Sequence, residues 1–430
     1  DQIKTLPTVI RTAQEGLQQY LPDKRAAFIV AATHEGKKFS PQIRALFKEL
    51  TIAGHFFTLD KELDGKGWAI RALMELGASF GSDLLLIEPD FVRQGEQGIQ
   101  PGWIHALYRP LEVGMEFVLP VFTRPPEGKR VTDQLVIPLL AALYGHRLQE
   151  PLGGAYAISR EILDIFLRDP DLYADTDVGN YGIDIFLTIT AIVQEVKICQ
   201  ANLGIRRKLH APGIFAVRLR ETVRTMFELI GYTAPWWLQR GRLIKTEPPF
   251  YGTLPALEPP VVDLDISAEI ERFRVDFRRN ADYLYKKLLH PSLYERLLDL
   301  SYTPGERFSF SSAEWAQCVY TLLLAYFFQK ETAREDILET VTILSRARAA
   351  AFMNEIRQFE GDTKVLISAR LREDQIRDFS LMRETFAEHW RDGTLLYAAP
   401  VERVLLEFLP GIPLNLPKEV SDTRGNAVRV

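Results

Sequence analysis

Short apolar runs alternate with amphipathic stretches along the first half of the chain. Residues 26–32 (AAFIVAA) and 83–90 (DLLLIEPD) contain continuous apolar runs, which are typical of strands buried on both faces of a sheet. Residues 40–54 space their apolar side chains as a helix does, with Ser40 in the N-cap position and Pro41 at the first helical position. This alternation predicts β/α units and a mostly parallel sheet. The other elements expected in this half are helices at 1–20, 65–81 and 103–114 and strands at 55–60 and 116–124.

The pattern changes after about residue 215, where long helical stretches replace the alternation. Helical spacing covers residues 269–300, 311–330 and 332–356, and residues 246–265 are rich in proline. Proline clusters between periodic segments are typical of linkers. We therefore expect an α/β domain over residues 1–245, a linker at 246–265 and a helical C-terminal domain at 266–430.

Composition narrows the class of protein. The chain has 430 residues, of which 47% are hydrophobic and 25% charged, and a net charge of −5. A negative net charge argues against a general nucleic-acid-binding protein, so no nucleic-acid partner is expected. Two cysteines, Cys199 and Cys318, provide neither a disulfide framework nor a cysteine zinc site, and they fit a cytoplasmic location. No apolar run reaches the roughly 18 residues of a membrane-spanning helix, so no transmembrane segment is expected.

The apolar run at 84–87 ends in two carboxylates, Glu88 and Asp90. In open α/β sheets, ligands bind beyond the carboxyl ends of the strands. Mg²⁺ and Mn²⁺ prefer oxygen ligands and often bridge carboxylates to substrate phosphates. The pair therefore suits a metal–diphosphate site. The alternative is a solvated strand end.

A second candidate element is the stretch DGKGWAIRA at residues 64–72. Gly65 and Gly67 allow close approach of the backbone to a ligand, and Lys66 offers a positive charge to phosphate. The helix that follows directs its positive end to the same place. The spacing differs from that of a Walker P-loop, and an ordinary glycine turn with an exposed lysine is the alternative.

Two glycine-containing segments follow further along the chain. Gly153 and Gly154 precede a short strand and a helix, and they can expose backbone N–H groups to a ligand. Asp184 lies in the first turn of a helix expected within residues 177–193. Its carboxylate either complements the helix dipole or faces the crevice beside the sheet.

A third segment combines basic residues with a histidine. His210 follows Arg206, Arg207 and Lys208 in the stretch GIRRKLHAPG. Imidazole is a common ligand beside two carboxylates, so His210 is a candidate third metal ligand. The basic residues would attract a diphosphate or an anionic acceptor. A solvated basic loop with a structural histidine is the alternative.

Taken in order, these motifs resemble those of retaining GT-A glycosyltransferases of the mannosylglycerate synthase and glucosyl-3-phosphoglycerate synthase type. The resemblance covers roughly residues 55–215. It rests on GKG at 65–67, EPD at 88–90, PLGG at 151–154, YGID at 181–184 and His210. It implies a GT-A fold, which has a Rossmann-like, mostly parallel sheet, for the α/β domain. It also implies a metal-dependent transfer of a hexose from a nucleotide diphosphate sugar, of the UDP-glucose or GDP-mannose class.

The resemblance also implies roles for individual residues. Glu88, Asp90 and His210 would hold Mg²⁺ or Mn²⁺ through the diphosphate. Tyr181 and Asp184 would position sugar hydroxyls or the attacking group. The remaining implied contacts, to phosphates and at the junction of sugar and acceptor, would come from Gly65, Lys66, Gly67, Leu152, Gly153 and Gly154. The implied acceptor is a small, hydroxylated, anionic (glycerate-like) molecule, with retention at the anomeric carbon.

Departures from the family pattern include the residue at position 88 and the start of the sheet. Glu88 stands where these families usually have aspartate, and the first nucleotide-binding strand of the family is absent. Since the chain also lacks an initiator methionine, we expect it to start inside the natural protein. The C-terminal helices would serve packing, acceptor closure or homo-oligomerisation.

Two other functions compete with this interpretation. A sugar nucleotidyltransferase would also use acids, lysine and magnesium, but it should carry an N-terminal glycine-rich nucleotide loop. A non-catalytic GT-A-fold protein that only binds a nucleotide sugar would tolerate Glu88 in place of aspartate.

Overall fold

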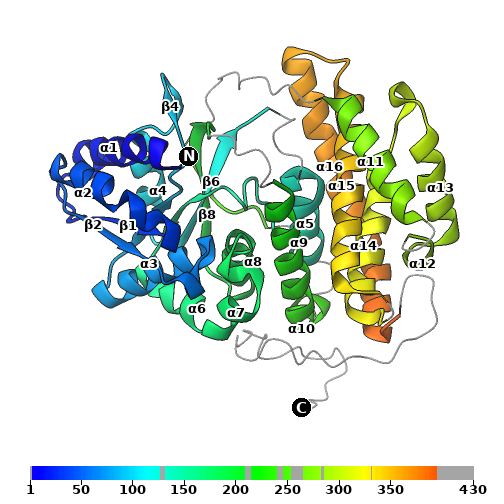
Figure 1. The fold of residues 1–430 in the computed structure, drawn as a ribbon, viewed down its shortest axis with the longest axis horizontal. Coiled ribbons are helices and arrows are strands. Elements are labelled where there is room, and N and C mark those ends of the chain that lie inside the picture. The colour runs from blue at the N-terminus through cyan, green and yellow to red at the C-terminus, as the bar shows by residue number, and fades with distance from the viewer. Residues whose placement is uncertain are drawn as a thin grey trace, which may run out of the picture.

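The computed structural model describes residues 2–125, 131–208, 215–239, 246–252, 265–281, 285–330 and 332–394. An α/β region at the N-terminal end is followed by a group of long helices at the opposite end of the molecule (Figure 1). The predicted fold class, an α/β region with a mostly parallel sheet followed by a helical region, is confirmed. In the part of the chain that is described, no helix is both long and apolar enough to cross a bilayer.

Five strands form the main sheet, in the order β3-β7-β6-β8-β9. β7 runs antiparallel to both of its neighbours, whereas β8 pairs in parallel with β6 and β9. β3, β6, β8 and β9 therefore point in the same direction. The strands span Leu84–Ile87 (β3), Phe117–Thr123 (β6), Ala155–Ile158 (β7), Ile198–Ile205 (β8) and Phe250–Tyr251 (β9).

A second, two-stranded sheet holds the first two strands, β1 (Phe28–Ala32) and β2 (Gly54–Thr58), which pair in parallel. The sequence predicted these strands but not their separation from the main sheet. A small antiparallel hairpin, β4 (Arg93–Gln94) with β5 (Gln97–Gly98), follows the acid pair.

Helices cover both faces of the main sheet, which explains why its strands are continuously apolar. Successive side chains of β6 point to opposite faces, so that Phe117 and Leu119 join one hydrophobic core and Val118 joins the other. The second core also contains Trp103 and Leu107 of α4. The helices of this half are α1 (Gln2–Tyr20), α2 (Ser40–Lys48), α3 (Lys66–Phe80), α4 (Gly102–Glu112), α5 (Ile137–Tyr144), α6 (Leu163–Leu167), α7 (Pro170–Asp175), α8 (Ile183–Val193), α9 (Phe215–Tyr232) and α10 (Ala234–Gln239).

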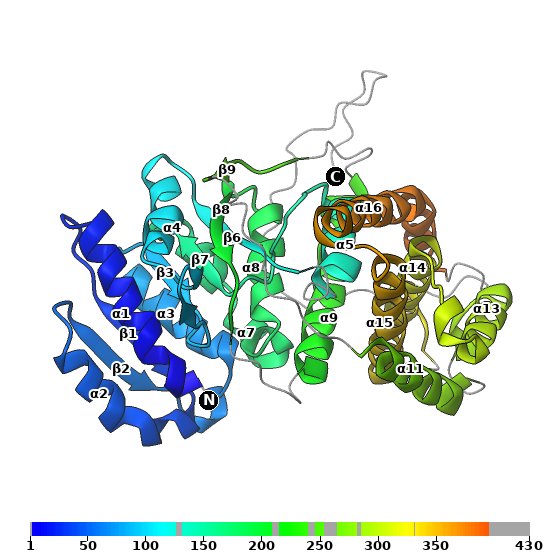
Figure 2. The same ribbon diagram turned by 90° about the horizontal axis from the view of Figure 1, so that it is seen from above.

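The C-terminal region is helical throughout its described part (Figure 2). Ser311 and Glu314 form a capping box that fixes the start of α14. α14 then continues as a nearly fully buried helix at the centre of this region. The helices are α11 (Ile266–Asn280), α12 (Lys286–Leu288), α13 (Pro291–Tyr302), α14 (Ser312–Phe328), α15 (Arg334–Ile356) and α16 (Gly361–Asp392).

The C-terminal helices attach to the α/β region at an irregular turn before α5. Residues Thr132–Val136 form a π-helical turn, in which backbone carbonyls lose their usual helical partners. The Asp133 carbonyl accepts a hydrogen bond from Gln375 at 3.0 Å, and the Gln134 carbonyl accepts one from the Trp315 indole at 2.6 Å. One continuous hydrophobic core extends from α3 to α16. The division into two domains stays a prediction, and most of the expected linker lies outside the described residues.

Candidate active site

The predicted chemistry converges at one edge of the main sheet. β3 and β8 both end there, which brings the acid pair after β3 beside the basic residues after β8. β7 runs the opposite way, so its first residue and the preceding Gly153–Gly154 lie at the same edge. The amino ends of α3 and α8 supply Lys66 and Asp184. Segments separated by more than 100 residues thus form a single cluster of charges.

Lys66 lies between two carboxylates. Its ammonium is 2.5 Å from Asp184 Oδ2 and also forms an ion pair with Glu88. Burial alone would lower the pKa of Lys66, but Asp184 and Glu88 together raise it above its usual value. Lys66 therefore remains a cation, and it is directed into the site instead of standing exposed on a turn.

Lys208 is the second cation of the cluster. It forms ion pairs with Glu88 and, at 3.1 Å, with Asp90 Oδ1. Its side chain is 14% exposed, and its ammonium also lies 4.3 Å from the centre of the Phe91 ring. Burial would raise the pKa of Glu88, but Lys208 and Lys66 hold it below the ordinary value. Glu88 is therefore ionised, despite its position in the interior of the site.

Tyr156 is a site residue that sequence reasoning missed. Its hydroxyl donates to Asp184 Oδ1 at 2.9 Å and accepts from the Gly154 N–H at 3.1 Å. Burial and the neighbouring Asp184 raise the pKa of Tyr156 well above its ordinary value, so its proton is retained. A tyrosine at the second position of an apolar strand is a weak signal, because its role depends on the pairing of β7 with β3.

The glycines of the predicted site serve close packing of the chain. A Cβ on Gly67 would lie 1.8 Å from the Val178 carbonyl, and one on Gly65 would lie 2.2 Å from the Gly179 carbonyl. A Cβ on Gly153 would meet Pro120 at 2.1 Å. Their contact with a nucleotide sugar stays a prediction.

Gly154 and Leu152 are both predicted to lie where sugar and acceptor meet, but they occupy different environments. Gly154 has a φ of +76°, and a Cβ there would lie 2.5 Å from the Glu88 carboxyl carbon. The Gly154 carbonyl also accepts from the Glu88 N–H at 3.0 Å. Leu152 is only partly buried and packs against the large core. Gly154 is thus part of the acid cluster, whereas the role of Leu152 at a sugar stays a prediction.

Among the described interactions, none joins Tyr181 to Glu88, Asp90 or Asp184. Its backbone N–H donates to Glu221 at 3.2 Å, and the Arg218 guanidinium lies 4.6 Å from the centre of its ring. The predicted role of Tyr181 in positioning a substrate stays a prediction. Arg218 is a further cation on this side that the sequence did not single out.

A buried ion pair lies close to the acid cluster. Arg124, directly after β6, pairs with the fully buried Glu150 at 2.8 Å. Arg206 lies nearby, and burial together with the charge of Arg124 lowers its pKa. The carboxyl edge of the sheet therefore carries several cations next to its acids, and these cations suit an anionic ligand such as a diphosphate.

The expected metal ligands are only partly described. Glu88 and Asp90 lie together, whereas His210 lies outside the described residues. Within the described ranges, no group of three or more His, Cys, Asp and Glu side chains could hold a metal ion. The two carboxylates nevertheless offer the oxygen ligands that Mg²⁺ and Mn²⁺ prefer.

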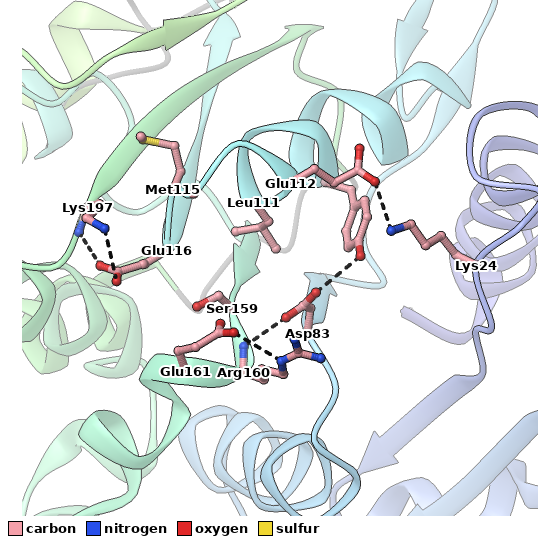
Figure 3. Close-up of a pocket in the computed structure, with 12 residues that line it drawn as sticks. Lys24, Asp83, Leu111, Glu112, Met115, Glu116, Ser159, Arg160, Glu161 and Lys197 are labelled. Carbon is pink, nitrogen blue, oxygen red and sulfur yellow. Dashed lines mark hydrogen bonds and ion pairs between the residues drawn. The ribbon is translucent and has the colours of Figure 1, made fainter.

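A polar cavity of about 470 Å³ lies at the other edge of the sheet (Figure 3). Asp83, Glu116 and Lys197 line it, and each precedes a strand of the main sheet. Most of its charges are paired with one another, as in the 3.0 Å contact of Lys24 with Glu112. Because ligands of α/β sheets bind at the carboxyl ends of the strands, the acid cluster is the better candidate for the active site.

No family model and no curated protein matches this chain. Among solved structures, glucosyl-3-phosphoglycerate synthase from Mycobacterium tuberculosis in complex with Mn²⁺, uridine-diphosphate-glucose and phosphoglyceric acid is 24% identical, covering 51% of this chain and 75% of that chain, with a TM-score of 0.39. The same enzyme with phosphoglyceric acid is 23% identical, covering 53% and 77%, with a TM-score of 0.40. Its complex with Mg²⁺ and uridine-diphosphate is 22% identical, covering 52% and 83%, with a TM-score of 0.36. Likeness of this degree leaves the activity to be argued from the residues of this chain.

Proposed function

We propose that the protein is a metal-dependent GT-A glycosyltransferase, which moves a hexose from a nucleotide diphosphate sugar to a small, hydroxylated, anionic acceptor with retention. The supporting observation is the cluster at the carboxyl edge of the sheet, in which Glu88 and Asp90 face Lys66 and Lys208, and Lys66 reaches Asp184. Two acids suit a divalent cation, and the surrounding cations suit a diphosphate.

Glu88 and Asp90 would hold Mg²⁺ or Mn²⁺, with His210 as the proposed third ligand. A bound divalent cation would neutralise the charge that develops on the departing diphosphate. Residues of the protein would further stabilise the phosphate oxygens. Lys66 lies at the amino end of α3, where its charge and the helix dipole both favour phosphate oxygens. One such preorganised donor is worth about 3–4 kcal/mol of transition-state stabilisation.

Asp184 is proposed to orient the donor sugar or the attacking hydroxyl. Lys66 and Tyr156 hold its two carboxylate oxygens, at 2.5 and 2.9 Å, so the side chain is fixed without a rotamer search. Retention would follow from attack on the face from which the diphosphate leaves. Arg218, stacked on Tyr181, adds a positive charge that suits an anionic, glycerate-like acceptor.

The cellular setting and the assembly also remain proposals. Cys199 and Cys318 are free and buried, which supports a reducing compartment such as the cytoplasm. The nucleotide base, of the UDP or GDP class, and a homo-oligomer stay predictions.

Calorimetry with UDP-glucose and GDP-mannose, with and without Mn²⁺, tests binding. A transfer assay with glycerate and 3-phosphoglycerate then tests turnover. We expect metal-dependent formation of a glycosylated acid and loss of this activity in Asp90→Ala. Full turnover by Asp90→Ala would remove the proposed metal site. Production of pyrophosphate would favour a nucleotidyltransferase, and tight binding without turnover would favour a non-catalytic binding protein.

A further inference from the structure

We infer that the Lys208 ammonium competes with a divalent cation for Glu88 and Asp90, so that metal binding requires Lys208 to move away. Lys208 forms ion pairs with both acids, and the contact with Asp90 Oδ1 measures 3.1 Å. It therefore already neutralises both carboxylates that would hold a divalent cation. The inference rests on the proposed function only in taking a divalent cation as the group that the acids bind.

Burial makes this competition strong. The side chains of Lys208 and Asp90 are 14% and 9% exposed, so water screens their charges poorly. Glu88 already faces Lys66 as well, and a third cation at this carboxylate would meet repulsion from both ammonium groups. A divalent cation therefore gains the full attraction of the acids only after Lys208 has left them.

The Lys208 side chain can move away from the two acids. Its four-carbon stem is flexible and carries a point charge that does not depend on a planar, two-pronged geometry. It also lies on the side of the site where Arg206 and Arg124 gather positive charge. A diphosphate bound there would offer the displaced ammonium new oxygen partners. Metal and nucleotide diphosphate should then bind with positive coupling. Each ligand lowers the free-energy cost of moving Lys208 away from the acids, which the other ligand would otherwise bear alone.

The test is a calorimetric Mn²⁺ titration of the full chain without any nucleotide. Lys208→Met removes the charge and keeps much of the side-chain volume, so we expect it to bind Mn²⁺ about tenfold tighter than the unmodified protein, or more. Lys208→Arg keeps the charge and should bind as weakly as the unmodified protein. Lys197→Met is the matched control, since Lys197 is 66% exposed and lies at the opposite edge of the sheet.

Two further measurements define the site and the coupling. Asp90→Asn in the Lys208→Met background should abolish the tight binding, which assigns it to the acid pair. Adding UDP or GDP should tighten Mn²⁺ binding to the unmodified protein and should do so far less in Lys208→Met. Circular dichroism and thermal melting check that each variant is folded.

Mn²⁺ affinity that stays the same or falls in Lys208→Met would overturn the inference, as would the absence of Mn²⁺ binding in both proteins. These outcomes are separate from the fate of the proposed function. Tighter Mn²⁺ binding without transfer from any sugar nucleotide would leave the competition standing and remove the glycosyltransferase. Transfer activity without tighter Mn²⁺ binding would do the reverse.

Discussion

Lys66 and Asp184 lie 118 residues apart in the sequence, and the fold brings the ammonium of one within 2.5 Å of the carboxylate of the other. Each residue lies in the first turn of a helix. A lysine at the amino end of a helix opposes the helix dipole, whereas an aspartate there complements it. The local disadvantage of Lys66 persists because Asp184 and Glu88 compensate its charge. Such conflicts between local preference and global fold are concentrated at functional sites.

Asp184→Asn tests this relationship directly. The variant removes a negative charge that faces Lys66, while an amide can still accept the hydrogen bond from Tyr156. We expect transfer activity to fall by about 100-fold or more, because the orienting carboxylate is lost. We also expect the free energy of unfolding to fall by about 1–3 kcal/mol, as Lys66 keeps Glu88 as a partner. Turnover and urea unfolding measure the two effects.

Tyr156→Phe is the matched control for that substitution. It removes the other hydrogen bond to Asp184 and leaves the ion pair with Lys66 intact. Its loss of activity should be the smaller of the two. An Asp184→Asn enzyme with unchanged turnover would contradict the proposed orienting role.

Gly154→Ala should destabilise the protein more than a glycine replacement elsewhere with a similar backbone angle. Gly154 has a φ of +76° and its new Cβ would meet the Glu88 carboxyl group at 2.5 Å. Gly114 has a φ of +88° with nothing within 4 Å of the added Cβ. Gly114→Ala should therefore cost only backbone strain of about 1 kcal/mol, and Gly154→Ala about 2 kcal/mol more. Equal midpoints in urea unfolding would show that the Glu88 side chain moves aside freely.

The ion pair of Arg124 with Glu150 should contribute far more to stability than an exposed pair of similar length. Arg124→Met would remove the guanidinium that pairs with the fully buried Glu150 at 2.8 Å, and we expect a loss of about 3 kcal/mol in unfolding free energy. Arg11→Met breaks a 2.7 Å pair with Glu49 in which both side chains are more than half exposed. That variant should lose less than about 1 kcal/mol. Similar losses in both variants would indicate that Arg206 takes over the role of Arg124.

The sequence predicts those parts of the site that depend only on local pattern and strand direction. The run 84–87 is a strand, α3 begins at Lys66, and Asp184 lies in the first turn of α8, all as expected. Because strands that point the same way end at one edge, the acids after β3 and the basic residues after β8 were expected to converge in a mostly parallel sheet.

The remaining features depend on pairings that no local pattern encodes. Tyr156 reaches Asp184 because β7 runs against its neighbours, and a parallel β7 would carry it away from the carboxyl edge. The sequence predicts that Lys208 attracts a diphosphate or an anionic acceptor, whereas the structure pairs it with the acids. The separation of β1 and β2 from the main sheet is likewise a matter of hydrogen-bond partners rather than of strand propensity.

Glu228 makes stability depend on pH in a direction that can be measured. It lies on α9 and its Oε1 accepts from the Tyr326 hydroxyl of α14 at 3.1 Å, while Oε2 is buried with no hydrogen-bond partner among the described residues. Burial raises the pKa of Glu228 above its ordinary value. A raised pKa means that the folded state binds the proton more tightly than the unfolded state. The stabilisation from protonated Glu228 is therefore present at low pH and is lost as pH rises from the ordinary glutamate pKa through the raised one.

Glu228→Gln should remove this dependence, since the amide is neutral at every pH and can still accept from Tyr326. We expect the variant to be more stable than the unmodified protein by about 1 kcal/mol at pH 7, with the difference disappearing near pH 4. Urea unfolding at the two pH values measures it. Glu96→Gln, at an exposed position, is the control and should show no such change with pH. A Glu228→Gln protein that loses stability at pH 7 would show that Arg224 and Arg334, whose charges also reach Glu228, outweigh its burial.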